Sequence, residues 1–147
     1  MNNAEVRRDA ENAEGPMSEN DIASQVIGAA IEVHKTIGPG LLESAYHECL
    51  MHELRLRDIR FENEFPIAVN YKGLAIGVAY RGDLLIENKV IVELNTVDVV
   101  LPVHKAQLLT YLRLAKRKLG LLINFIDSLR PLRLCVLCVR ERVSTCY

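Results

Sequence analysis

Two carboxylates, Asp83 and Glu93, lie ten positions apart in a run that is otherwise rich in Leu, Ile and Val. The run divides into two strand-like segments, residues 83–87 and 90–94, and a tight polar Asn-Lys turn joins them. A hairpin of this kind can bring the two side chains together, and paired carboxylates suit hard cations such as Mg²⁺ or Mn²⁺ rather than zinc. The alternative is two strand ends that face water, because an acid within an apolar run is costly to bury unless it is compensated.

Several ordered motifs surround this pair. They are Gly40-Leu-Leu-Glu43-Ser-Ala-Tyr46, Tyr80-Arg-Gly-Asp83, Val92-Glu93-Leu94, Pro102-Val-His-Lys-Ala-Gln107-Leu-Leu-Thr-Tyr111-Leu and Leu119-Gly-Leu-Leu-Ile-Asn-Phe125. Their order and spacing resemble the GxxExxY proteins over about residues 22–125. That family is placed in the PD-(D/E)XK superfamily, whose members have a restriction-endonuclease-like fold.

The resemblance implies an α/β fold with a mixed four-stranded central sheet flanked by helices, and a Mg²⁺-dependent site that cleaves phosphodiester bonds. It implies that Asp83 and Glu93 are the metal-binding acids and that Glu43 supplies a further carboxylate from a helix. The backbone carbonyl of Leu94 would be a further ligand. Gln107 resembles the glutamine that such nucleases carry on the helix after the Glu-x-Lys strand, and nucleic acid would be the partner.

Three further side chains are candidates for accessory roles. Tyr111 and His104 share the Gln107 face of one helix, at i+4 and i−3. His104 could act on the attacking water; the alternative is a histidine that bonds its own backbone at a helix N-terminus. Tyr46, three residues after Glu43, would hold the Glu43 carboxylate or pack beneath it.

Asn95 departs from the pattern, because a nuclease of this layout places a lysine two positions after the glutamate. Asparagine is neutral and shorter, and losing one preorganised electrostatic group costs on the order of 10²–10³ in rate. Neither Lys89 nor Lys105 replaces it convincingly, because one lies four residues before Glu93 and the other points away from the Gln107 face.

Three hypotheses follow from Asn95. In the first, the chain is a metal-dependent nuclease, either active or weakened. In the second, it is an inactive family member that binds nucleic acid or a protein partner, including a second copy of itself. The third hypothesis is an engineered Lys→Asn exchange.

The elements that must position these residues follow the order ααββββαββ, which predicts a mixed sheet with helices against it. Residues 1–19 are expected to form a disordered leader, and residues 20–147 a single PD-(D/E)XK-like domain. Ser18 or Asn20 would cap the first helix, which Gly38-Pro39-Gly40 breaks. The other expected segments are a helix at about 41–57, strands at 61–70, 74–80, 83–87 and 90–94, a helix at about 103–118 that Gly120 ends, and strands at 121–126 and 132–139.

Composition sets the outer bounds on the class of protein. The chain has 147 residues, half of them hydrophobic, and its apolar runs are shorter than the ~18 residues needed to span a bilayer. With no signal-peptide pattern visible, a cytoplasmic location is expected. Net charge is −8 over residues 1–100 and +7 over residues 101–147. The basic part could attract a polyanion, or it could be a solvated face offset by the acidic part.

Four cysteines without a secretory pattern are expected to be reduced thiols. Cys135 and Cys138 form a CxxC in a strand-like run, where the two sulfurs would point to opposite faces. A zinc site with Cys146 would lack a fourth ligand. The sequence therefore predicts two buried thiols near one edge of the sheet.

Overall fold

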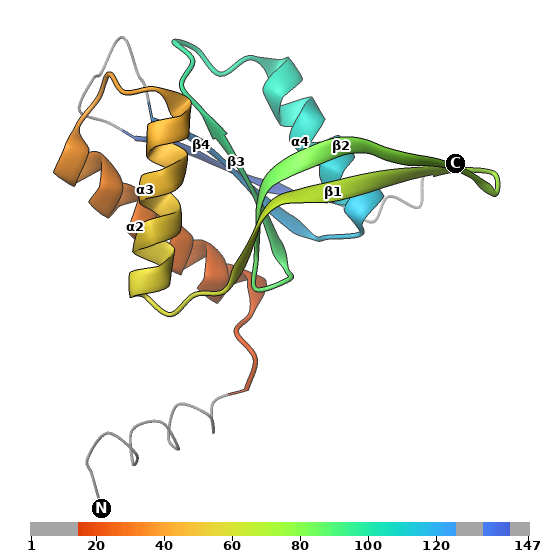
Figure 1. Ribbon diagram of the computed structural model, residues 1–147, viewed down its shortest axis with the longest axis horizontal. Coiled ribbons are helices and arrows are strands. Elements are labelled where there is room, and N and C mark those ends of the chain that lie inside the picture. The colour runs from red at the N-terminus through yellow and green to blue at the C-terminus, as the bar shows by residue number, and fades with distance from the viewer. Residues whose placement is uncertain (1–14, 126–133, 142–147) are drawn as a thin grey trace, which may run out of the picture.

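The computed structural model describes residues 15–125 and 134–141. These ranges contain three helices and five strands, arranged as helices on both sides of one twisted sheet (Figure 1). Most of the expected leader, residues 1–14, lies outside the described residues, as do the start of the expected last strand at Leu132 and Cys146. The elements are α2 (Glu19–Ile37), α3 (Glu43–Leu56), β1 (Phe61–Tyr71), β2 (Leu74–Ile86), β3 (Val90–Asn95), α4 (Pro102–Ala115), β4 (Leu119–Asn124) and β5 (Cys135–Arg140).

The sheet is mixed, with the strand order β1-β2-β3-β4-β5. Neighbouring strands are antiparallel except β3 and β4, which run parallel with Val90 opposite Leu119 and Asn95 opposite Asn124. A parallel pair needs a long crossover, and α4 supplies it. The α/β, restriction-endonuclease-like class predicted from the sequence is thus the observed one.

Both faces of the sheet are covered, which explains why its central strands are apolar at almost every position. Leu84, Val92 and Leu121 belong to the core shared with α2 and α3. Leu85, Ile91 and Leu122 belong to the core shared with α4. Successive strand residues point to opposite faces of the sheet. Asp83 therefore lies on the same face as Leu85, and Glu93 and Asn95 lie on the same face as Ile91. This is the face that α4 covers.

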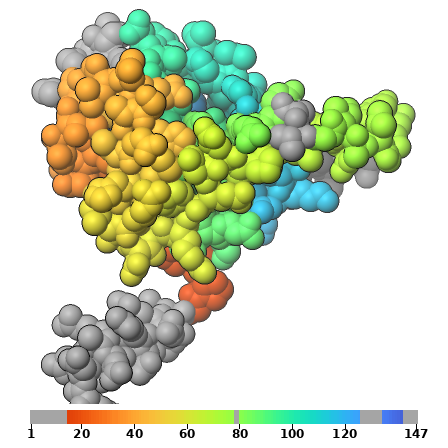
Figure 2. Space-filling view, in the orientation of Figure 1, coloured from red at the N-terminus to blue at the C-terminus, as the bar shows by residue number. Residues whose placement is uncertain are grey.

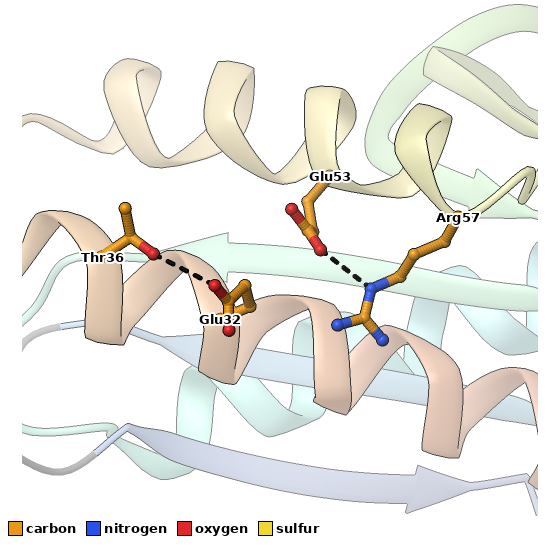
Figure 3. A network of polar contacts seen from close by, with 4 residues as sticks. All are labelled: Glu32, Thr36, Glu53 and Arg57. Carbon is orange, nitrogen blue, oxygen red and sulfur yellow. Dashed lines mark hydrogen bonds and ion pairs between the residues drawn. The ribbon is translucent and has the colours of Figure 1, made fainter.

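Helices α2 and α3 pack side by side through apolar residues. Their polar bonds on the exposed side remain within each helix, as Figure 3 shows: Thr36 Oγ1 donates to Glu32 Oε1 over 3.4 Å, and Arg57 Nε lies 3.0 Å from Glu53 Oε1. Exposed pairs of this kind contribute only about 0.3–0.5 kcal/mol. Burial of the apolar faces therefore holds the pair against the sheet.

Ser18 caps α2, as predicted, because its side chain accepts a hydrogen bond from Asp21 N–H and the Asp21 carboxylate accepts from Ser18 N–H. The end of α4 differs from the prediction. Lys116 ends this helix in the left-handed conformation, φ 56°, whereas Gly120 lies inside β4. A Cβ on Gly120 would lie 2.9 Å from Leu108 Cδ1, so this glycine lets α4 pack closely on the sheet.

The predicted order ααββββαββ contains one strand too many on the N-terminal side of the sheet. The expected break at Arg81-Gly82 is absent, because β2 runs from Leu74 to Ile86 without interruption and the described order is ααβββαββ. Gly82 pairs with Phe65 across β1, and a Cβ there would overlap the Phe65 ring. The described sheet also has five strands, where the resemblance implied four.

The CxxC lies in β5, an edge strand of the described sheet, as predicted. The prediction of two buried thiols was wrong, because Cys135 is half-buried and Cys138 is exposed. Both are free thiols. Side chains of an edge strand have a neighbouring strand on one side only, so they are covered less completely than the side chains of a central strand.

The outer part of the β1–β2 hairpin extends beyond the rest of the sheet (Figure 1). We call residues 68–82 the arm. Its ladder slips twice, between the pairs Ile67↔Tyr80 and Ala68↔Val78 and again before Asn70↔Ala75, and each slip leaves an extra residue on β2. Bulges bend and twist a ribbon.

Among the described residues, no helix combines the length and apolar character needed to cross a bilayer.

Candidate active site

Asp83 and Glu93 meet across the β2–β3 hairpin, as the sequence predicted. Leu84 lies opposite Val92, so the next positions in this register are Asp83 and Glu93. Asp83 N–H donates to Glu93 Oε1 over 3.0 Å, and Leu94 N–H donates to Asp83 Oδ2 over 2.7 Å. Each carboxylate is thus fixed by the backbone of the opposite strand.

The pair favours a bound proton. Burial, followed by the charge of Asp83, raises the pKa of Glu93 from 4.5 to about 8, and the charge of Glu43 adds to the effect. A carboxylate that is buried beside another carboxylate ionises reluctantly, because burial removes its hydration and the neighbouring charge repels its own. A bound cation would compensate the same negative charge that the proton compensates.

Glu43 approaches the pair from a helix. It is the first residue of α3, and its pKa is raised by partial burial and by the charge of Asp83, while His47 lowers it. Three acidic side chains from α3, β2 and β3 thus influence one another. His47, one helical turn after Glu43, was not singled out in the sequence; its Nε2 is buried and makes no hydrogen bond among the described residues.

Tyr46 holds the loop before Glu43 rather than the Glu43 carboxylate. The fully buried side chain donates its hydroxyl proton to the Gly38 carbonyl over 2.6 Å and accepts from Leu41 N–H over 3.3 Å. Its ring stacks on Phe125, with centroids 4.4 Å apart. Tyr46 thus anchors the α2–α3 loop to the end of β4 and sets where α3 begins.

On the opposite side of the acid pair, α4 contributes a polar and an aromatic group. Gln107 Nε2 donates to the Tyr111 hydroxyl over 2.6 Å. Burial raises the pKa of Tyr111, and the charges of Glu93 and Asp83 raise it further, which places this side chain beside the pair. The ring of Tyr80, a residue to which the sequence analysis assigned no role, lies 5.6 Å from that of Tyr111.

His104 bonds the backbone at the N-terminus of its helix, which was the alternative to a role on the attacking water. Its Nδ1 accepts a hydrogen bond from Leu101 N–H over 2.9 Å, at the N-terminus of α4. This contact orients the ring by satisfying one of the free amides at the start of the helix.

Asn95 lies two residues after Glu93 on the same face of β3, and it is half-buried. Its carbonyl accepts from Phe125 N–H over 3.0 Å. The neighbouring Asn124, which the sequence analysis did not single out, is buried and binds both backbone groups of Val97 through its amide. Asn124 thereby fixes the chain as it leaves β3; a polar residue at the end of an apolar strand was the available signal.

A cation that would replace the missing lysine is not found among the described ion pairs, since none of them involves Asp83, Glu93 or Glu43. Lys89 Nζ donates to the Met17 carbonyl over 2.7 Å, at the other end of β3. Lys105 is exposed on α4. The sequence-based rejection of both lysines agrees with these positions.

The donors of the site suit a hard divalent cation better than zinc, because they are all oxygens. In the described part of the chain, however, no three side chains of His, Cys, Asp or Glu converge closely enough to enclose a metal ion. Mg²⁺ does not require such a cage, since it usually keeps several waters and binds through one or two carboxylates. The Asp83–Glu93 pair, with its mutual repulsion, fits that mode of binding.

Comparison with known proteins assigns the chain to a family. The family model of the PD-(D/E)XK nuclease superfamily matches residues 20–133. The chain therefore belongs to the PD-(D/E)XK nuclease superfamily, and the matched range includes the acid pair, Glu43 and Gln107.

Among solved structures, the chain is similar to one titled "Crystal structure of SSO0001", with 20% identity and a TM-score of 0.51. The alignment covers 95% of this chain and 76% of the other, and at this identity the likeness concerns the fold. No curated protein matches the chain.

Proposed function

We propose that this protein is a metal-dependent nuclease whose hydrolysis of phosphodiester bonds is impaired by Asn95. The observation that carries the proposal is the convergence of Asp83 and Glu93 on the α4 face, where burial and like charge raise the pKa of Glu93 to about 8. Structural ion pairs lower carboxylate pKa values, whereas uncompensated acids that crowd one place are typical of sites that bind a cation.

Asp83, Glu93 and the Leu94 carbonyl would hold Mg²⁺ or Mn²⁺, and Glu43 would approach from α3. Bound there, the ion would lower the pKa of a water ligand and neutralise charge on the reacting phosphate. The Gln107 amide and the Tyr111 hydroxyl, already bonded to each other, would orient the phosphate from the α4 side. The backbone bonds to Asp83 and Glu93 would keep both carboxylates preorganised.

Asn95 weakens this site in one specific respect. A lysine at the same position on β3 would extend over the Glu93 side of the site and stabilise the anionic transition state. An asparagine can donate a hydrogen bond but carries no charge. This supports a second candidate function, a non-catalytic member that binds nucleic acid or a protein partner.

The test is cleavage of plasmid and single-stranded DNA with Mg²⁺ or Mn²⁺ by the chain as it stands, by Asn95→Lys and by Asn95→Lys/Asp83→Ala. We expect Asn95→Lys to cut about 10²–10³ times faster than the unaltered chain, and the Asp83→Ala double variant to be inactive. If only the lysine form cuts, the chain is a disabled nuclease. If no form cuts any nucleic acid under either metal, the nuclease proposal is wrong.

A further inference from the structure

The arm, residues 68–82, has a composition unlike the rest of the N-terminal part of the chain. Residues 1–100 carry a net charge of −8, yet the arm has Lys72 and Arg81 and no Asp or Glu. The nearest acids along the chain are Glu64, four residues before the arm, and Asp83, directly after it. A ribbon that carries only cations is electrostatically suited to follow a polyanion.

Large apolar side chains of the arm face water. Figure 2 shows the arm standing clear of the body of the molecule, so its surface has little opportunity to pack on the chain's own core. Exposed apolar residues scattered singly need no explanation, but several on one thin ribbon mark a contact surface. They are Tyr71 (60% exposed), Leu74 (62%), Ile76 (58%) and Tyr80 (44%).

Tyr80 connects this surface to the acid pair. It lies at the base of the arm, three residues before Asp83, and its ring is tilted by 46° against that of Tyr111 at a centroid distance of 5.6 Å. Tyr111 itself is buried and shares a core with Leu85 and Ile91, which lie two residues from Asp83 and Glu93 on their strands and so point to the same face. Tyr80 is therefore one aromatic ring away from the acids and still has exposed ring surface.

We propose that Tyr80 stacks on an unpaired nucleobase next to the phosphate that a cation held by Asp83 and Glu93 would bind, while Lys72 and Arg81 lie along the sugar-phosphate backbone. The substrate class would then be single-stranded nucleic acid. This inference rests on the proposed function for the position of the phosphate. A base within a duplex already stacks and pairs with its neighbours, so it offers no free face to a tyrosine.

A nucleic-acid strand fits the arm better than a second copy of the chain does. If two arms packed against each other, Lys72 and Arg81 of one would face the same cations of the other without any acid in either arm to compensate them. A single strand instead supplies a phosphate for each cation and a base for each exposed ring.

The test is fluorescence anisotropy at low salt, in EDTA so that cleavage does not interfere, with a short oligothymidylate and a duplex of the same length. Tyr80→Ala should weaken binding of the single strand about 10- to 100-fold, since one stacked base contributes that much. Its duplex binding should be unchanged, and Tyr80→Phe should bind as the unaltered chain does.

Two controls separate stacking from a structural role. Tyr80→Leu keeps an apolar contact with Tyr111 but lacks a stacking face, so it should lose single-strand affinity while its melting temperature stays close to that of the unaltered chain. Leu56→Ala removes an apolar side chain on α3 that is more exposed than Tyr80, 68% against 44%, and should bind normally.

Three outcomes would overturn the inference: Tyr80→Ala binds the single strand normally, it loses affinity equally for strand and duplex, or it converts a dimer to a monomer in light scattering, which would make the arm an interface between copies. Failure here is distinguishable from failure of the proposed function. Metal-dependent cutting by Asn95→Lys would leave the nuclease proposal standing even if Tyr80 plays no part in binding.

Discussion

At the scale of single residues, Glu93 links stability to pH. Its pKa is raised from 4.5 to about 8, first by burial and then by the charge of Asp83. Between these values the folded chain holds a proton that the unfolded chain has released. Stability contributed by this group is therefore fully present below about pH 4.5 and is lost as the pH rises through about 8.

We expect the metal-free protein to become less stable relative to Glu93→Gln as the pH rises across this window, by at most about 1.4 kcal/mol per pH unit. The glutamine cannot ionise, yet its Oε1 can still accept the bond from Asp83 N–H. Urea denaturation of both proteins in EDTA, at about pH 5 and about pH 8, measures the difference. Glu48→Gln, an exposed acid on α3, is the control, and parallel pH profiles for Glu93→Gln and the unaltered chain would contradict the expectation.

The acid pair itself was predictable from the sequence because its geometry is local. A short polar turn between two apolar segments fixes a hairpin, and the hairpin fixes Asp83 beside Glu93. Glu43 and Gln107 came from the resemblance alone, since they lie on α3 and α4. Tyr80 was missed as a site residue because its partner, Tyr111, lies 31 positions later (111 − 80) and belongs to another element.

At the scale of elements, glycines explain where the predicted boundaries were wrong. Both Gly82 and Gly120 suggest breaks, because glycine usually marks turns and helix ends. Both lie inside strands, under the Phe65 ring and the Leu108 side chain respectively. A glycine selected for close packing is indistinguishable in sequence from one selected for a turn, because the side chain that covers it is remote in the chain.

Tyr46 shows how a loop and a helix start are held by one buried side chain. We expect Tyr46→Phe to lower the free energy of unfolding by about 1–3 kcal/mol, because it leaves the Gly38 carbonyl and Leu41 N–H without their partner. The ring should still stack on Phe125. Chemical denaturation measures the change.

The matched control for this change is Tyr71→Phe, since Tyr71 is 60% exposed and an exposed substitution should alter stability by no more than about 0.5 kcal/mol. Equal effects of the two substitutions would show that the Tyr46 hydroxyl does not anchor the loop. In that case the start of α3, and with it Glu43, would have to be positioned by apolar packing alone.

At the scale of the whole molecule, the basic C-terminal third is only partly available to a partner. Arg113 Nε lies 3.7 Å from a Glu141 carboxylate oxygen, Arg117 donates to Asn88 Oδ1 over 2.7 Å, and Arg140 donates to Asn20 Oδ1 over 2.6 Å. Asn88 and Asn20 are neutral and Glu141 belongs to the same third of the chain, so these contacts engage three arginines without pairing them with the acidic part. Lys105 and Lys118 differ, because both are exposed and no described ion pair or side-chain hydrogen bond involves them.

Lys105 and Lys118 therefore provide the clearest test of long-range attraction for nucleic acid. Binding of a short oligothymidylate, measured in EDTA over a series of salt concentrations, should weaken linearly with salt concentration on logarithmic scales, because binding releases counterions from the strand. Lys105→Gln/Lys118→Gln should reduce the slope by about 0.7 for each lysine that meets a phosphate. Lys35→Gln removes an exposed charge from α2, on the other face of the sheet, and should leave the slope unchanged. Affinity that does not respond to salt would mean that phosphate contacts contribute little, and a protein partner would then be the better explanation for this face.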